Sequence, residues 1–378
     1  MSQEPTQGAN NKFAFALLGQ LLKASNNAER NVFFSPFSVF SAASALLLGS
    51  AEKSEVELKE ALSLENVSNI PEHLRETRSS ILQAVKGVEL STANKLYPET
   101  SFKIKEDFLA LVKEVFQTDI QPLDFIKNGE EARKAINKWV SDVTKDKIKD
   151  LLQPGTITAD TRLVLANAIY FKGNWQEQFK QENTTERDFH VTPQKVVKAK
   201  FMKRKAKYQF AFDEELKLQL LEIPYSGETT SMVIALPSEK FGLNELEKKF
   251  SAEKLNEMEK NYFKEEVVLS LPRFKIEYSS DLVESFKGLG ARSIFGSGAN
   301  FSKISCKEDL YVSAIAHKAF VEVNEEGTEA AAATAIVMTR MALLPPHEFM
   351  CDHPFLFFIK HKPTNTILFV GRYVNPEA

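Results

Sequence analysis

The spacing of apolar residues predicts helices in the N-terminal part of the chain. Phe13, Leu17, Leu18, Leu21 and Leu22 recur at the interval of one helix face. Further helices are expected over residues 41–48, 55–62, 71–85, 106–116 and 130–145. The last of these carries an apolar stripe made of Ala132, Ala135, Ile136, Trp139, Val140 and Val143. This stripe predicts that the helix packs one face on a core.

Strand patterns dominate from residue 162 onward. Residues 162–171 form a nearly continuous apolar run, which is typical of a buried strand. Residues 216–224 and 231–237 flank the turn sequence Tyr225-Ser226-Gly227-Glu228 and indicate a hairpin. Residues 273–278 alternate apolar and polar, and two further strands are expected over 355–359 and 367–373. Helices followed by strands predict an α+β fold.

One segment changes its pattern abruptly near residue 325. Residues 319–324 alternate as a strand does, and Glu325-Glu326-Gly327 then interrupts the alternation like a hinge. The alanines at 330–333 taken alone favour helix. Read as a strand, the segment has one uncharged face made of Thr328, Ala330, Ala332, Thr334, Ile336 and Met338. The charged Glu329 falls on the opposite face with Ala331, so the uncharged face could be buried within a sheet.

Composition bounds the class of protein. The chain has 378 residues, 43% of them hydrophobic, and no linker or low-complexity run divides it, so a single domain over 1–378 is expected. A net charge of -3 gives no reason to expect nucleic-acid or membrane binding, and no apolar run approaches the length of a membrane span. The only cysteines, Cys306 and Cys351, are expected to be free buried thiols, with one disulfide between them as the alternative.

Two clusters could carry chemistry. The segment from His347 to His353 has Cys351 where H-E-x-x-H needs its second histidine, so no metal site is predicted. The sequence also lacks the G-x-S-x-G motif of an α/β-hydrolase nucleophile. A second cluster holds seven cations: Lys195, Lys198, Lys200, Lys203, Arg204, Lys205 and Lys207. A solvated strand face explains it most simply. The alternative is a site for a polyanion such as a heparin-like glycosaminoglycan.

The run from His317 to Ala332 resembles the hinge of an inhibitory serpin. Three other stretches resemble serpin landmarks: Asn31-Val32-Phe33-Phe34-Ser35-Pro36-Phe37-Ser38, the strand Asn167 to Trp175, and the C-terminal segments Asp352-His353-Pro354-Phe355 and Phe369-Val370-Gly371-Arg372. The match runs from about Asn11 to Pro376 in the expected order. The resemblance implies a large central sheet with further sheets, flanking helices and an exposed reactive-centre loop at about 325–346.

The resemblance also implies a mechanism. A serine protease cleaves the loop and becomes trapped as a covalent 1:1 acyl-enzyme complex when the loop inserts into the central sheet. The chain would thus be an inhibitor and not an enzyme, metastable in its native state and monomeric, with no required cofactor. A non-inhibitory serpin (carrier, store or chaperone) is the first alternative, and a hydrolase is the second. The uncharged inward face of the hinge favours the inhibitor.

Individual roles carry over from the resemblance. Ser35, Ser38, Asn167 and His317 match the polar cluster where the strands part, and Trp175 matches the tryptophan where insertion begins. Glu325 matches the acidic residue at the base of the hinge, with Arg273 as its partner. The family's register places the attacked bond at Met341–Ala342, which suits chymotrypsin-like or elastase-like proteases. A register one residue shorter places it at Arg340–Met341, which suits trypsin-like ones.

The sequence gives only weak signals of location. The first residues have neither a basic start nor an apolar core, so no signal peptide is expected in them. Glycosylation sequons occur at Asn66, Asn183 and Asn300. An extracellular protein whose signal peptide has been removed is expected, with a cytosolic protein as the alternative.

Overall fold

The computed structural model describes residues 5–24, 29–83, 87–307, 309–326 and 346–378. Its helices are α1 (Pro5–Ala24), α2 (Pro36–Gly49), α3 (Glu52–Ala61), α4 (Ile70–Ile81), α5 (Glu106–Phe116), α6 (Phe125–Val143), α7 (Leu243–Lys249), α8 (Ala252–Lys260) and α9 (Val283–Gly288). Its strands are β1 (Val32–Phe34), β2 (Val88–Pro98), β3 (Leu163–Gly173), β4 (Thr185–Thr192), β5 (Lys195–Asp213), β6 (Leu218–Pro224), β7 (Thr230–Pro237), β8 (Phe263–Pro272), β9 (Phe274–Asp281), β10 (Val312–Val323), β11 (His347–Met350), β12 (Phe355–His361) and β13 (Thr366–Tyr373). The predicted α+β class is confirmed.

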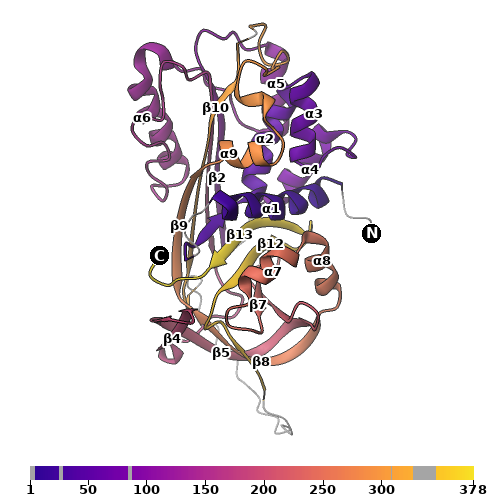
Figure 1. The fold of residues 1–378 in the computed structure, drawn as a ribbon, viewed down its shortest axis with the longest axis vertical. Coiled ribbons are helices and arrows are strands. Elements are labelled where there is room, and N and C mark those ends of the chain that lie inside the picture. The colour runs from indigo at the N-terminus through magenta and orange to yellow at the C-terminus, as the bar shows by residue number, and fades with distance from the viewer. Residues whose placement is uncertain (1–4, 25–28, 84–86, 308, 327–345) are drawn as a thin grey trace.

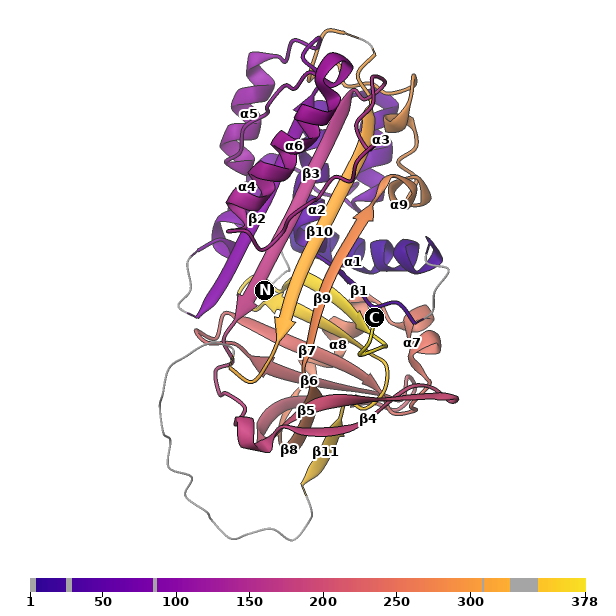
Figure 2. The ribbon, with the colours of Figure 1, turned by 90° about the vertical axis from the view of Figure 1, so that its left-hand side faces the viewer.

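A four-stranded sheet in the order β2-β3-β10-β9 runs along the long axis of the molecule (Figure 2). Strands β3 and β10 are parallel, with His317 opposite Asn167 in their register. The pairs β2–β3 and β10–β9 are antiparallel. The described part of this sheet therefore has a parallel pair at its centre, between two antiparallel neighbours.

The other strands form a nine-stranded sheet with the order β1-β13-β12-β7-β6-β5-β8-β11, in which β4 pairs with β5. Its strands cross below the four-stranded sheet in the view of Figure 2. The pairing of β11 with β8 is parallel, and β11 lies at the edge of the sheet. The chain thus leaves one sheet at the end of β10 and enters the other sheet at β11.

Helices cover both faces of the four-stranded sheet. In Figure 1, α6 lies alone on one face, while α2 and its neighbouring helices lie on the other. The face under α6 has its own apolar cluster, in which small residues of the sheet (Ala93, Ala166, Ala168, Ala314 and Ala316) meet Ile136 and Val140 of the helix. Small side chains let the helix approach the strands closely. The main core lies on the opposite face.

Most of the predicted elements form, with some shifted ends. The helix predicted over 106–116 is α5, and the predicted hairpin is β6–β7, whose turn holds Gly227 and Glu228 at positive φ. Helix α4 ends at Ile81 rather than 85. Helix α6 begins at Phe125 rather than 130, because the Asp124 side chain caps it by accepting a hydrogen bond from the backbone N–H of Lys127.

Several strands have no counterpart among the predicted elements. These are the short strand β1, the edge strand β2, and β4, β8 and β11. The basic cluster lies within the long strand β5, as the solvated-strand interpretation requires. Both cysteines are free as predicted, but only Cys351 is buried, and the expected burial of Cys306 is wrong because it is exposed. No helix in the described ranges is both long and apolar enough to cross a membrane.

Candidate functional site

Four buried polar residues join the parallel strands β3 and β10 to helix α2. The backbone N–H of Ser35 donates to Nε2 of His317, so the imidazole proton sits on Nδ1 and is donated to Oδ1 of Asn167. The amide nitrogen of Asn167 donates in turn to Oγ of Ser38, at 2.8 Å. Burial lowers the pKa of His317 to about 3, so the ring is neutral. The four residues predicted as the sheet-opening cluster therefore lie in one hydrogen-bonded network.

The start of α2 explains the position of its two serines. Ser35 is the N-cap residue and Pro36 occupies the first turn, where a missing N–H costs nothing. Oγ of Ser35 accepts a hydrogen bond from the backbone N–H of Ser38 and donates one to the carbonyl of Leu368 in the larger sheet. The cap thus connects the helix, the polar network and the second sheet.

Asn94 completes the network, and sequence reasoning missed it. Its Oδ1 accepts hydrogen bonds from Oγ of Ser38 and from Nδ2 of Asn167. It lies on β2, directly opposite Asn167 in the register of β2 and β3. The available signal was a lone amide within the segment 88–98, which was not recognised as a strand. With Asn94 included, the network reaches three adjacent strands of the sheet.

Trp175 closes the end of the β3–β10 pair. Its indole Nε1 donates to the carbonyl of Asn324, 2.9 Å away, directly after the last residue of β10. Its ring stacks on Tyr225 with ring centres 4.5 Å apart. The indole is buried, so this hydrogen bond is partly shielded from water. Trp175 therefore fixes the point at which the chain leaves β10.

Glu325 is anchored from two sides at the start of the predicted hinge. Its carboxylate lies 3.3 Å from Nε of Arg273 and accepts a hydrogen bond from Oγ1 of Thr184. Its carbonyl accepts from the backbone N–H of Phe179. The Glu325 side chain is buried, whereas Arg273 is 44% exposed, so solvent weakens the ion pair. The structure thus places the acidic residue and its predicted partner side by side.

Of the remaining loop residues, only Glu326 and Pro346 are described, and the backbone N–H of Glu326 donates to Oδ1 of Asn324. The undescribed set comprises the hinge residues Gly327, Thr328, Glu329, Ala330, Ala331 and Ala332, and the residues Arg340, Met341 and Ala342 of the two predicted bonds. Their roles stay predictions.

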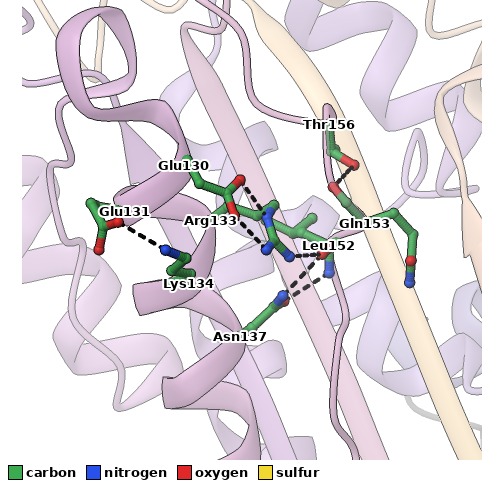
Figure 3. A network of polar contacts seen from close by, with 8 residues as sticks. All are labelled: Glu130, Glu131, Arg133, Lys134, Asn137, Leu152, Gln153 and Thr156. Atoms are coloured by element: carbon green, nitrogen blue, oxygen red, sulfur yellow. Dashed lines mark hydrogen bonds and ion pairs between the residues drawn. The ribbon is translucent and has the colours of Figure 1, made fainter.

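Helix α6 is held over the parallel strands by hydrogen bonds to the segment that follows it. Asn137 makes a reciprocal pair with Leu152, in which its amide donates to the carbonyl and accepts from the backbone N–H. Arg133 donates to the same carbonyl and forms an ion pair with Glu130 (Figure 3). The helix thus covers the face of the sheet that carries Ala166, Ala168, Ala314 and Ala316.

The basic cluster on β5 is partly neutralised by nearby carboxylates. Lys195, Lys198 and Lys205 form ion pairs with Glu29, Asp188 and Glu266, respectively. Arg204 instead lies over the ring of Phe179 and donates to the hydroxyl of Tyr208. Ion-paired lysines fit the solvated-strand interpretation, and the polyanion site stays a prediction.

The histidines of the segment 347–353 do not converge. Nε2 of His347 contacts the side chain of Gln219, whereas His353 lies between Asp352 and the carbonyl of Pro237. Within the part of the chain that the structure describes, no three or more His, Cys, Asp or Glu side chains are grouped so as to hold a metal ion.

Comparisons with known proteins agree with this geometry. The family described as "Serpin (serine protease inhibitor)" matches residues 8–376. The leukocyte elastase inhibitor of Sus scrofa is 42% identical, over 99% of this chain and 100% of that protein. Serpin B4 of Homo sapiens is 39% identical, over 97% of this chain and 98% of that protein. The structure of uncleaved ovalbumin superimposes with a TM-score of 0.89 at 31% identity, covering 98% of this chain and 100% of that one.

The fold and the matches define one class of protein. The chain belongs to the serpin family, the serine protease inhibitors. The resemblance read from the hinge is thereby confirmed. The residues that the resemblance assigns to sheet opening and to the base of the hinge lie at the β3–β10 pair and directly after β10, and their roles stay predictions.

Proposed function

We propose that the chain inhibits its target protease as a suicide substrate whose loop, at about 325–346, inserts between β3 and β10. The protease cleaves the loop and is held as an acyl-enzyme. The N-terminal part of the loop then enters the sheet and carries the bound protease with it. The non-inhibitory alternative requires a hinge that resists insertion.

The parallel pairing of β3 and β10 is the observation that carries this proposal. A segment that reverses direction after β10 runs antiparallel to β10, and therefore antiparallel to β3 as well. Its insertion would replace one parallel ladder by two antiparallel ladders, and antiparallel pairing is somewhat more stable per residue. The gain in ladder hydrogen bonds supports an insertion that proceeds spontaneously after cleavage.

The side-chain pattern of the loop also favours insertion into the sheet. Thr328, Ala330 and Ala332 would point inward, and Glu329 would remain in water. An inward charge would cost several kcal/mol, because it would lose its hydration without gaining a partner. This segment carries none.

The attacked bond is proposed to be Met341–Ala342, with Arg340–Met341 as the alternative. An unbranched apolar side chain at Met341 suits the pocket of an elastase-like or chymotrypsin-like protease. The relatives named leukocyte elastase inhibitor support this class of target. Arg340 would instead suit the carboxylate-bearing pocket of a trypsin-like protease.

Incubation with neutrophil elastase, chymotrypsin and trypsin tests the proposal. The expected products are an SDS-stable complex and a released peptide that begins at Ala342. A released peptide that begins at Met341 would instead identify Arg340 as the bait. Cleavage by all three proteases without any complex would contradict the inhibitory mechanism.

We further propose that the protein acts in the cytosol, in place of the extracellular location expected from the sequence. Cys306 is an exposed free thiol, which is easily oxidised outside the cell, and Cys351 is also unpaired. Immunoblotting of the cytosolic fraction and of the culture medium of expressing cells tests this. Glycosylated protein in the medium would restore the extracellular alternative.

A further inference from the structure

Strand β10 contains one extra residue where it begins beside β3. Val312 and Ala314 lie opposite two successive residues of β3, so Ser313 between them has no partner in the register. The side chain of Ser313 nevertheless joins the two chain segments, because its Oγ accepts a hydrogen bond from the backbone N–H of Arg162, 2.9 Å away. Arg162 directly precedes β3. A side chain thus takes the place of a ladder hydrogen bond at this bulge.

A second side chain joins the same two segments. The hydroxyl of Tyr311 donates a hydrogen bond to the backbone carbonyl of Asp160, 2.7 Å away. This bond and the one between Ser313 and Arg162 are together called the start clamp, because both strands begin beside it. From the start clamp, β3 and β10 run parallel toward the nine-stranded sheet (Figure 2). The base of the hinge follows the other end of β10, so the clamp and the hinge lie at opposite ends of the strand pair.

The proposed insertion of the loop reaches the start clamp last. A segment that turns back after β10 pairs with it antiparallel, so residue numbers in the inserted strand rise as those in β10 fall. With Thr328 opposite Val323, roughly Met338 would lie opposite Ser313. The C-terminal end of the cleaved strand would therefore meet the clamp only after most of the strand has entered the sheet.

We propose that the start clamp controls the last step of insertion, with Ser313 as its positioning residue. This inference rests on the proposed insertion of the loop between β3 and β10. The first part of the strand can pair with β10 while the clamp is closed, but the end of the strand cannot occupy the gap until both hydrogen bonds break. The clamp therefore adds a free-energy cost that falls on complete insertion alone. Complete insertion carries the protease farthest, so the clamp influences whether a cleaved loop traps the protease or releases it.

Two synthetic peptides added to the intact protein test the clamp without any protease. The long peptide comprises residues 328–341 and reaches the clamp, whereas the short peptide comprises residues 328–335 and ends before it. An extended peptide can add to a sheet as a further strand through main-chain hydrogen bonds. Fluorescence anisotropy of the labelled peptides at equilibrium gives the dissociation constant of each one.

Ser313→Ala should lower the dissociation constant of the long peptide by about two- to tenfold, because the variant has already lost a hydrogen bond that complete insertion breaks. The dissociation constant of the short peptide should not change. Ser313→Thr keeps the hydroxyl and should bind both peptides as the unmodified protein does. Ser251→Ala is the matched control. Oγ of Ser251 accepts the same kind of hydrogen bond, from the backbone N–H of Lys254 at the start of α8, so neither dissociation constant should change.

Thermal unfolding first verifies that each variant is folded. The clamp is refuted if both peptides bind the unmodified protein and Ser313→Ala changes their dissociation constants equally or not at all. It is also refuted if Ser313→Thr behaves like Ser313→Ala, because the effect would then come from packing and not from the hydroxyl. Binding of neither peptide to any of the proteins would refute the proposed insertion itself, and the clamp with it.

Discussion

The imidazole of His317 donates its Nδ1 proton to the side-chain oxygen of Asn167, and these two residues face each other across the parallel strands β10 and β3. Both side chains are fully buried. The bond therefore joins the two strands that the proposed insertion would separate. Breaking this hydrogen bond would leave two buried polar groups without partners, which costs free energy. The bond therefore helps to keep β3 and β10 together unless a larger gain in free energy offsets its loss.

Asn94→Ala is expected to destabilise the native state by about 1–3 kcal/mol, because Ser38 and Asn167 lose the oxygen to which both donate. Thermal unfolding measures the change. Asn261→Ala is the matched control: its amide makes one exposed hydrogen bond, and the expected change is within about 0.5 kcal/mol. Equal shifts in both variants would show that Asn94 has no special part in the network.

The stability of the native state is expected to fall with acidification through His317. Its folded-state pKa of about 3 lies below the usual 6.5, so the unfolded chain takes up the proton first. This contribution is complete above pH 6.5 and is lost as the pH falls from 6.5 toward 3, at up to about 1.4 kcal/mol per pH unit. Melting temperatures between pH 7 and pH 5 measure the effect.

The His317→Gln variant isolates this titration. Burial also lowers the pKa of His361, but that group is unchanged in the variant, so the difference between the two proteins reports His317. The variant should start less stable and depend less on pH. If the two proteins lose stability in parallel down to pH 5, His317 is not the group that titrates.

Thr328→Arg should convert the inhibitor into a substrate that is cleaved without forming a complex. The new guanidinium would lie on the inward face of the inserting strand, where burial costs several kcal/mol. Glu329→Arg places the same side chain on the outward face and should still form the SDS-stable complex. A covalent complex with the Thr328 variant would show that insertion does not need an uncharged inward face.

Asn137→Ala should loosen helix α6 from the segment that follows it. The change leaves the N–H of Leu152 without its acceptor, which is expected to cost about 1–3 kcal/mol. Hydrogen exchange of the amide of Leu152 should accelerate. Lys134→Ala removes only an exposed ion pair with Glu131 on the same helix, and exchange there should not change.

The polyanion prediction for β5 can be tested by salt-dependent elution from a heparin column. Lys203→Gln with Lys207→Gln should lower the salt concentration at elution if local charge captures sulfated chains. Lys198→Gln is the control, because Lys198 already pairs with Asp188 and the change should matter less. If the unmodified protein and both variants elute at the same salt concentration, the polyanion-site interpretation is wrong and the cluster is a solvated strand face.

Asn167 and His317 were identified through the family resemblance and not through the local pattern. The pattern predicted only that residues 162–171 and 319–324 form strands. Asn94 was missed because β2 is an edge strand whose side chains are mostly half-buried, so its alternation is weak. The predicted start of α6 at residue 130 lies just after Asn128, where the backbone departs from helical geometry. The first turn of the helix, from Phe125, lies before this irregularity and was therefore not predicted.

The parallel relation of β3 and β10 could not be obtained from local pattern. A buried strand reads as an apolar run whether its neighbour is parallel or antiparallel. Residues 163–173 and 312–323 are far apart in the chain, and only the topology places them side by side. The structure alone shows that pairing.

The parallel centre of the sheet has a consequence for how much protease one molecule can remove. In the proposed mechanism, a cleaved strand that fills the gap between β3 and β10 completes both ladders, and the inserted state is then lower in free energy than the native state. Each inhibitor molecule therefore inactivates at most one protease molecule. The amount of protease that a cell can neutralise is then set by how many copies it has made and how fast it replaces them.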